Sequence, residues 1–213
     1  MPKADPFRVI ATEADLAEGC AHLAAVCPAW AEALPQIMPL PLRLRADGFT
    51  TMAEAIIGQQ ISVAAAASIR ARMEAAGLMS EDALRMADDD TLRTAGLSRP
   101  KARYLRGIAE ARLDWAGLRA LPDDEAIARL TALPGIGVWT AEIYLKFALG
   151  RADVFAAGDL ALQEGARLLY GLETRPGPAA LRVLAEPWQP WRAVAARGLW
   201  AYYRLAKGRE GVT

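Results

Sequence analysis

The segment that most constrains this chain is Leu133-Pro134-Gly135-Ile136-Gly137, which stands directly before a predicted helix over 138–149. Pro134 fixes its own φ angle, and the two glycines can adopt backbone angles that other residues avoid. The segment therefore predicts a tight hairpin whose N–H groups point together at a helix N-terminus, where free donors and the helix dipole attract anions. An ordinary loop before a helix fits the same five residues, because Pro-Gly is a common turn pair.

A single carboxylate follows the hairpin helix. Asp159, in Gly158-Asp159-Leu160, stands at the start of a predicted helix that reaches about Tyr170. Asp is a preferred N-cap residue, so a purely structural role fits this position. A capping position also holds a carboxylate rigidly, which makes the cap compatible with catalysis. A hairpin suited to a phosphate, with a carboxylate one helix away, favours chemistry on a nucleic acid strand.

The composition indicates a mostly helical protein, since Ala, Leu and Arg dominate and runs of β-branched residues are scarce. Among the 213 residues, 25 basic side chains balance 25 acidic ones, so any contact with nucleic acid must come from local patches. Cys20, Cys27 and His22 are too few for a four-ligand zinc site without carboxylates, and for a four-cysteine iron–sulfur cluster. We expect a cytoplasmic protein, because no signal peptide or membrane span is evident.

Turn and cap residues predict the order of the helices. Thr12 should cap a helix that reaches about Val26, and Thr50 or Thr51 should cap a single long helix that reaches about Ala75 and is ended by Gly77. Ser80 and Asp88 should cap short helices, and Ser98 should begin a basic helix. Residues 122–125 should open the helix before the hairpin, and the last helix should span about Trp188 to Lys207. Prolines at 28, 35, 39 and 41 should interrupt the chain, and 176–178 should form a loop.

Taken together, four ordered segments resemble the helix-hairpin-helix base-excision DNA glycosylase superfamily, and within it the DNA-3-methyladenine glycosylase II branch. They are Ile56-Ile57-Gly58-Gln59-Gln60-Ile61-Ser62, the residues 133–141, Asp159, and Trp188-Gln189-Pro190-Trp191-Arg192. The resemblance implies an all-α fold of two helical lobes with a cleft between them and the hairpin at its mouth. We expect one lobe from 1–47 plus 152–213 and a central lobe, 48–151, that carries the motif at about 123–149. The chain is similar to the compact form without an N-terminal β-sheet domain.

The resemblance implies a monofunctional glycosylase that hydrolyses the N-glycosidic bond of alkylated purines after base flipping. Asp159 matches the catalytic aspartate, whose negative charge would stabilise the positive charge that develops on the sugar. Trp139 stands where lyase members carry a lysine, and an indole cannot form a Schiff base. We therefore expect base hydrolysis without strand cleavage. Core packing of Trp139 is the alternative.

The same resemblance assigns the base pocket and the DNA contacts. Trp200 aligns with a pocket tryptophan, with Trp139, Tyr144 and Phe49 as weaker candidates, whereas Trp188 and Trp191 fit the core better. Gln60 falls where the family inserts a wedge side chain, although it also fits a bond inside the fold. The expected DNA-binding residues are Gly135, Ile136, Gly137, Thr140, Gln60 and Lys101, with Arg103 and Arg106 as further phosphate contacts and Gln59 and Ser62 in structural bonds.

The expected partner is double-stranded DNA that contains damaged bases. We expect no membrane association and no obligate protein partner, and we expect the protein to be a monomer associated with the nucleoid. No redox cofactor or essential metal is implied, but the family often holds Na+ or K+ on hairpin carbonyls, here those of Thr131, Leu133 and Ile136. Three alternatives stay open: a non-catalytic helix-hairpin-helix DNA-binding protein, a glycosylase for another lesion class, and a helical protein unrelated to DNA. The preferred lesion stays open as well.

Overall fold

The fold consists of α-helices and two short 3-10 helices, and the computed structural model describes residues 8–208. Within that range there is no β-strand; Val9 and Arg151 form an isolated antiparallel bridge. The predicted all-α class is therefore confirmed. No helix within the same range is long and apolar enough to cross a membrane.

The chain divides into two compact units, which we call the terminal unit (Met1–Leu44 with Leu145–Thr213) and the central unit (Arg45–Tyr144). The second division lies inside the helix α9, Val138–Phe147. The sequence-based lobe boundaries, at 47/48 and 151/152, lie a few residues away. Those domain bounds, and the cleft between the lobes, stay predictions.

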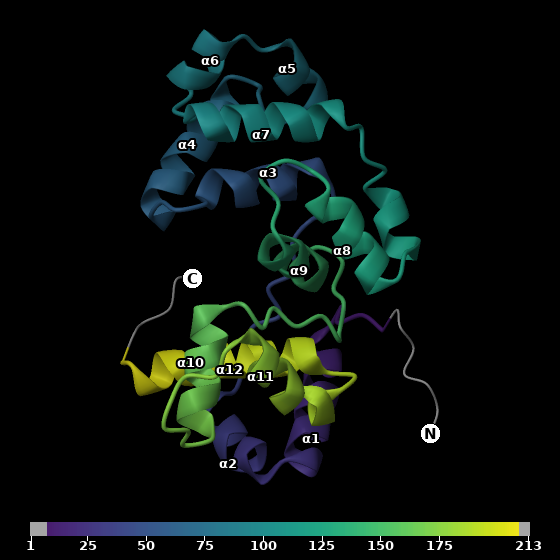
Figure 1. Cartoon of the computed structure of the whole chain (residues 1–213), viewed down its shortest axis with the longest axis vertical. Helices are drawn as coiled ribbons and strands as arrows, with labels where there is room; N and C mark the ends of the chain where they lie inside the picture. Colours follow the sequence, from purple (N-terminus) through teal and green to yellow (C-terminus); the bar gives the residue numbers. More distant parts are fainter. Residues whose placement is uncertain (1–7, 209–213) are drawn as a thin grey trace. The chain divides into compact units, whose positions relative to one another are not determined.

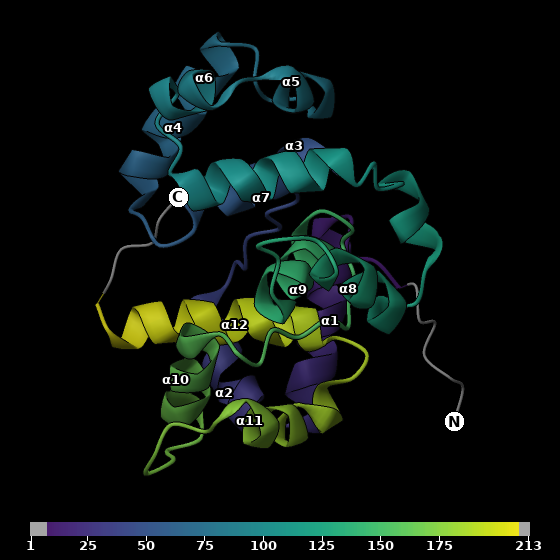
Figure 2. The same cartoon turned by 45° about the horizontal axis from the view of Figure 1, so that its top comes forward.

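The terminal unit contains helices from both ends of the sequence, as Figures 1 and 2 show. They are α1 (Glu13–Val26), α2 (Pro28–Ile37), α10 (Leu160–Leu169), α11 (Pro178–Leu184), the 3-10 helix η2 (Glu186–Trp188) and α12 (Arg192–Ala206). Trp188 lies at the centre of the core, edge-on to Trp30 at 5.7 Å between ring centroids and stacked on Tyr170 at 6.3 Å. Trp188 and Trp191 are fully buried, so both belong to the core.

The central unit holds α3 (Phe49–Gly58), α4 (Val63–Ala75), α5 (Glu81–Met86), α6 (Asp89–Thr94), α7 (Arg99–Glu110), the 3-10 helix η1 (Ala116–Ala120), α8 (Asp123–Thr131) and most of α9. Helix α7 packs against α3 and α5, and Figure 1 shows it running beside α3. Its buried residues Leu105, Ile108 and Ala109 supply the apolar face of this contact.

Most predicted caps are present. The hydroxyl of Thr12 accepts from the amide of Asp15, and the Asp15 carboxylate accepts from the amide of Thr12, which forms a capping box. Ser80 and Asp88 cap α5 and α6 through their side chains, and Gly77, with φ +69°, follows the end of α4. Local sequence therefore determined these helix ends.

The predicted single helix from Thr50 or Thr51 to Ala75 is wrong. Helix α3 begins after Gly48 and ends at Gly58, and α4 begins at Val63 with Ser62 as its N-cap. Gln60 has φ +59° in the break, a left-handed conformation that an α-helix cannot contain. The two segments are therefore separate helices with a loop between them.

Three other proline-containing regions also differ from the prediction. Pro28 begins α2, where its missing N–H costs no hydrogen bond, and Pro35 lies inside that helix. Pro178 likewise begins α11 instead of extending a loop. The last long helix starts at Arg192, because Gln189 and Pro190 separate it from η2.

Candidate DNA-binding and catalytic site

The predicted hairpin is a β-turn between α8 and α9. The amide of Ile136 donates to the carbonyl of Leu133 at 3.3 Å, with Pro134 and Gly135 as the two central residues. Gly135 has φ +79°, the angle that a type II turn requires at its third position. The carbonyl of Gly137 then accepts from Ala141 at 3.0 Å and begins α9. Sequence and structure therefore agree on a tight turn at a helix N-terminus.

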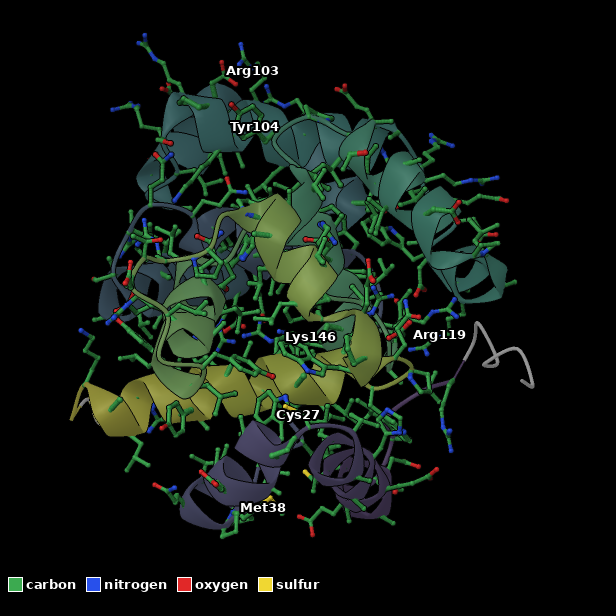
Figure 3. All side chains as sticks on the ribbon, turned by 60° about the horizontal axis from the view of Figure 1, so that its bottom comes forward. Cys27, Met38, Arg103, Tyr104, Arg119 and Lys146 are labelled. Atoms are coloured by element: carbon green, nitrogen blue, oxygen red, sulfur yellow. The ribbon has the colours of Figure 1, made fainter. Side chains whose placement is uncertain are left out.

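Helix α7 packs against the hairpin. A Cβ atom on Gly135 would lie 2.5 Å from the Tyr104 ring, so only glycine fits against this side chain, which Figure 3 labels. A Cβ atom on Gly107 would likewise lie 2.7 Å from Cγ of Pro134. The side-chain amide of Gln59 donates to the Gly135 carbonyl at 3.1 Å. The hairpin is thus held from three positions of the central unit.

The backbone amides of the hairpin differ in their exposure and in their hydrogen bonds. Gly137 is exposed, and a Cβ atom there would meet nothing within 4 Å. Its N–H lies at the N-terminus of α9, where helix geometry leaves donors unpaired. The N–H of Ile136 is used inside the turn and its side chain is buried, as is Thr140. Among the predicted hairpin contacts, Gly137 is the one whose surroundings best suit an anion.

The predicted wedge residue lies in the loop between α3 and α4. Gln60 is exposed, not bonded within a helix as the alternative had it. The neighbouring residues make the structural bonds that we expected of them: Gln59 binds the hairpin, and the Ser62 hydroxyl accepts from the amide of Ala65. Gln60 thus projects from a loop whose two flanks are anchored.

Two basic residues of α7, Lys101 and Arg106, bind groups of the protein itself. Lys101 donates to the carbonyls of Ile57 at 2.6 Å and Gln59 at 2.7 Å, and burial lowers the pKa of its ammonium group. Arg106 binds the Asp89 carboxylate and the Ala87 carbonyl. A phosphate contact of Lys101 stays a prediction, whereas the structure gives this side chain a different role at the end of α3.

Asp159 is the N-cap of α10 in the terminal unit. Its Oδ1 accepts from the amides of Ala161 at 2.8 Å and Leu162 at 3.3 Å, and the residue is half-buried between exposed Gly158 and Leu160. These charge-assisted bonds fix the carboxylate relative to the helix axis. The cap expected from sequence is therefore present, and a catalytic role for the same carboxylate stays a prediction.

Hydrogen bonds within the terminal unit hold the turn before Asp159. Buried Gln163 donates its side-chain amide to the carbonyl of Ala157 at 2.9 Å, and Arg182 donates to the carbonyl of Phe155 at 3.2 Å. The amide of Asp159 itself donates to Ala156 at 2.9 Å. Sequence reasoning missed Gln163, although its spacing of four from Asp159 places it one helical turn further along α10.

Two predicted pocket aromatics lie in the interior of the central unit. Tyr144 is 3% exposed and Phe49 is 8% exposed. Both pack on Trp115, with ring centroids 5.7 Å and 6.3 Å away. The Tyr144 hydroxyl donates to the Asp47 carboxylate and accepts from the amide of Gly48, so burial and Asp47 raise its pKa. Their predicted contact with a base is untested, but each has a clear packing role.

Trp139 is 46% exposed, so the alternative that it packs in the core is wrong. It lies in the first turn of α9, next to exposed Gly137 and Val138. No lysine occupies this position. The partly exposed indole therefore lies at the same helix end as the hairpin amides.

Trp200 is half-buried on α12 and has two cationic neighbours. The guanidinium carbons of Arg43 and Arg204 lie 5.1 Å and 5.3 Å from its ring centroid, within cation–π range. Nearby Arg197 is buried, and desolvation together with Arg43 lowers its pKa to about 10. A base that stacks on Trp200 must therefore compete with an arginine for the ring.

No group of three or more His, Cys, Asp or Glu side chains in residues 8–208 is arranged to hold a metal ion. Cys20 and Cys27 are free thiols, and Cys27, labelled in Figure 3, lies 3.2 Å from the Tyr170 hydroxyl. The carbonyls predicted to hold a monovalent cation belong to the end of α8 and to the turn. That of Leu133 accepts one hydrogen bond, from Ile136.

The comparisons identify the family of this fold and motif. A family model described as "HhH-GPD superfamily base excision DNA repair protein" matches residues 53–190. This segment contains the hairpin, Gln60 and Asp159, and it covers more than half of the chain. The chain belongs to this superfamily.

Named relatives share much of the sequence. DNA-3-methyladenine glycosylase 1 of Schizosaccharomyces pombe is 32% identical over 171 residues, which cover 75% of this chain and 74% of that protein. The matches with three other curated relatives span 57–60% of those proteins' length.

Solved structures agree with the fold. A structure titled as DNA-3-methyladenine glycosidase from Bacillus halodurans aligns with a TM-score of 0.79 and 32% identity, over 90% of this chain and 92% of that one. The S. pombe 3-methyladenine DNA glycosylase Mag1, solved in complex with abasic DNA, aligns with a TM-score of 0.74 and 29% identity, over 89% and 97% of the two chains.

Proposed function

We propose that this protein is a monofunctional DNA glycosylase that hydrolyses the N-glycosidic bond of alkylated purines in duplex DNA. The observation that carries the proposal is the match with DNA-3-methyladenine glycosylase 1 over three quarters of both chains, within a family segment that includes the hairpin and Asp159. We further infer that it acts as a monomer on damaged DNA in the cytoplasm. The rigid turn and the fixed carboxylate support this function.

The hairpin is the proposed grip on the DNA backbone. The N–H of Gly137 and the following first-turn amides of α9 suit a phosphate oxygen, and the helix dipole favours its negative charge. Gly137 has no Cβ atom to keep a phosphodiester away, and the space beside it is open. The grip depends on backbone groups, which agrees with a chain whose formal net charge is zero.

Asp159 is the proposed catalytic residue. When the glycosidic bond breaks, the departing base takes the bonding electron pair and the sugar becomes positively charged. A carboxylate fixed beside the sugar lowers the energy of that charge, and water then attacks the sugar carbon and gives up a proton. An alkylated purine that is already cationic leaves without protonation by an acid. One carboxylate therefore suffices for this substrate class.

A monovalent cation on the hairpin is a separate part of the proposal. The carbonyl of Thr131 lies at the C-terminal end of α8, where acceptors are unpaired and the helix dipole is negative. The Leu133 carbonyl retains a lone pair beyond its bond to Ile136. These oxygen donors fit Na+ or K+, with Ile136 as the third ligand, and such an ion would stiffen the turn.

The experiment is base release from a methylated duplex by the wild type and by Asp159→Asn. Asn retains the N-cap, so the variant should fold and bind DNA as the wild type does. Its rate of base release should fall by about a hundredfold or more, as expected for loss of a charge that stabilises the transition state. Free base is measured by chromatography, and binding by fluorescence anisotropy with an abasic-site duplex.

The outcomes distinguish the remaining functions. A wild type that binds the duplex but releases no base is a non-catalytic DNA-binding protein. Release of oxidised bases, with strand nicking in the absence of alkali, indicates a glycosylase of the lyase type. Equal rates for the wild type and Asp159→Asn would remove Asp159 from the mechanism.

A further inference from the structure

One face of α7 contacts both DNA-binding candidates of the central unit. Lys101, Tyr104 and Gly107 are spaced three residues apart, so they lie along one side of the helix. Tyr104 and Gly107 lie against the hairpin at Gly135 and Pro134. Lys101 binds the other element, the loop between α3 and α4. This helix face therefore sets the position of the loop relative to the hairpin.

Lys101 caps the end of α3. Its ammonium group lies 2.6 Å from the carbonyl oxygen of Ile57 and 2.7 Å from that of Gln59. Carbonyls at a helix C-terminus lack partners within the helix, and a cation there also complements the helix dipole. Two of the three ammonium hydrogens are thus bound to the backbone on either side of Gly58. The side chain is committed to this loop.

Gln59 extends the same connection to the hairpin. Its carbonyl accepts from Lys101, and its side-chain amide donates to the carbonyl of Gly135. The next residue, Gln60, has φ +59° and an exposed side chain. Left-handed geometry at a non-glycine residue persists only where neighbouring contacts support it. The bonds of Lys101 and Gln59 hold the backbone directly before this residue.

We propose that Lys101 is a positioning residue for base flipping, which holds the α3–α4 loop so that Gln60 projects rigidly at a fixed distance from the hairpin. The inference rests on the proposed glycosylase function and on the wedge role predicted for Gln60, whose side chain would fill the space that the extruded base leaves. A wedge on a pre-ordered backbone enters the duplex without the entropic cost of ordering the loop. Lys101 therefore acts through Gln60 and not on the DNA directly.

The test is a double-mutant cycle on Lys101→Met and Gln60→Ala. Single-turnover base release is measured with excess protein on a duplex with one alkylated purine. Each single variant should slow release about tenfold, and the double variant should be no slower than the slower single, because both remove the same step. On a substrate with the lesion unpaired in a bulge, Lys101→Met should come within about twofold of wild type, because flipping is then easier.

Arg99→Met is the matched control. Arg99 is an exposed cation on the same helix, so its loss changes the net charge equally without touching α3. Its rate should stay within about twofold of wild type, as expected for a surface substitution.

Multiplicative effects of Lys101→Met and Gln60→Ala would overturn the inference. So would an equal defect on paired and bulged substrates. A fall of about 0.9 in the slope of log K against log salt, in Lys101→Met only, would instead make Lys101 a phosphate contact.

If Lys101→Met is unfolded at the assay temperature, Gln59→Met replaces it in the cycle. That variant removes the bond to Gly135 and leaves the end of α3 capped. It should show the same non-additivity with Gln60→Ala, and additivity would overturn the inference. A wild type that releases no base refutes the proposed function, whereas an active wild type with independent variants refutes this inference alone.

Discussion

The backbones of Gly165 and Leu199 touch where α10 crosses α12. A Cβ atom on Gly165 would lie 2.5 Å from the carbonyl oxygen of Leu199, closer than such atoms approach in proteins. This contact fixes the orientation of α10, whose N-terminus carries Asp159. The position of the proposed catalytic carboxylate thus depends on the absence of a side chain at residue 165.

Gly165→Ala should force the two helices apart. We expect a loss of about 1–3 kcal/mol of unfolding free energy, as for other overpacked sites, measured by urea unfolding. Gly177→Ala is the control, because a Cβ atom there meets nothing within 4 Å in the same unit. Equal stabilities for the two variants would contradict the close crossing.

The two roles of Asp159 should separate in a stability series. Asp159→Asn keeps an acceptor for the amides of Ala161 and Leu162, whereas Asp159→Ala removes it. The Ala variant should lose about 1 kcal/mol, and the Asn variant much less, in urea unfolding. Both should lose base release. A variant that loses stability but retains base release would leave the cap as the residue's only role.

Gly135→Ala and Gly137→Ala should fail in different ways. Gly135 has φ +79° and touches Tyr104, so the first variant should destabilise the central unit by about 1–3 kcal/mol. Gly137 faces open space, so the second should fold normally but bind duplex DNA about tenfold more weakly, because its Cβ keeps a phosphate from the amides. Thermal melting and anisotropy measure the two effects. Wild-type affinity in Gly137→Ala would argue against the hairpin grip.

We expect no lyase activity, because Trp139 occupies the position where lyase members carry a lysine. A Schiff base requires an amine, and the indole at this position has none. Incubation with abasic-site DNA and borohydride should give no covalent protein–DNA product in denaturing gels. A lyase-type glycosylase provides the positive control, and an adduct with the wild type would locate an unrecognised amine nucleophile.

Asp15 should make α1 sensitive to acid. Its carboxylate accepts from the amides of Ala11 and Thr12 and from the Thr12 hydroxyl, and these bonds hold its pKa below the ordinary value of 3.8. Because the folded-state pKa is lowered, the added stability is present above pH 3.8 and is lost as the pH falls through the folded value. Asp15→Asn should melt below wild type at pH 7, and the difference should vanish in acid. A constant difference at every pH would contradict this linkage.

Sequence predicted the features that depend on local chemistry. The Thr12, Ser80 and Asp88 caps, the hairpin turn and the Asp159 cap all follow from side chains within a few residues. The break after α3 could not be predicted in this way, because a glycine within an apolar helical pattern does not by itself show that the helix ends there. Lys101, more than forty residues later, supplies the cap that stabilises this end. The burial of Tyr144 against Trp115 likewise depends on tertiary packing that no local pattern encodes.

The terminal unit draws its core from both ends of the sequence, since residues of α1 and α2 pack with α10 and α12 around Trp188. The whole central unit is translated between these two sets of helices. The central unit, continuous in sequence, can therefore fold while the chain is still on the ribosome. Helices α1 and α2 can complete their packing only after α12 has been synthesised, so the core that holds α10, with Asp159 at its N-terminus, requires both ends of the sequence.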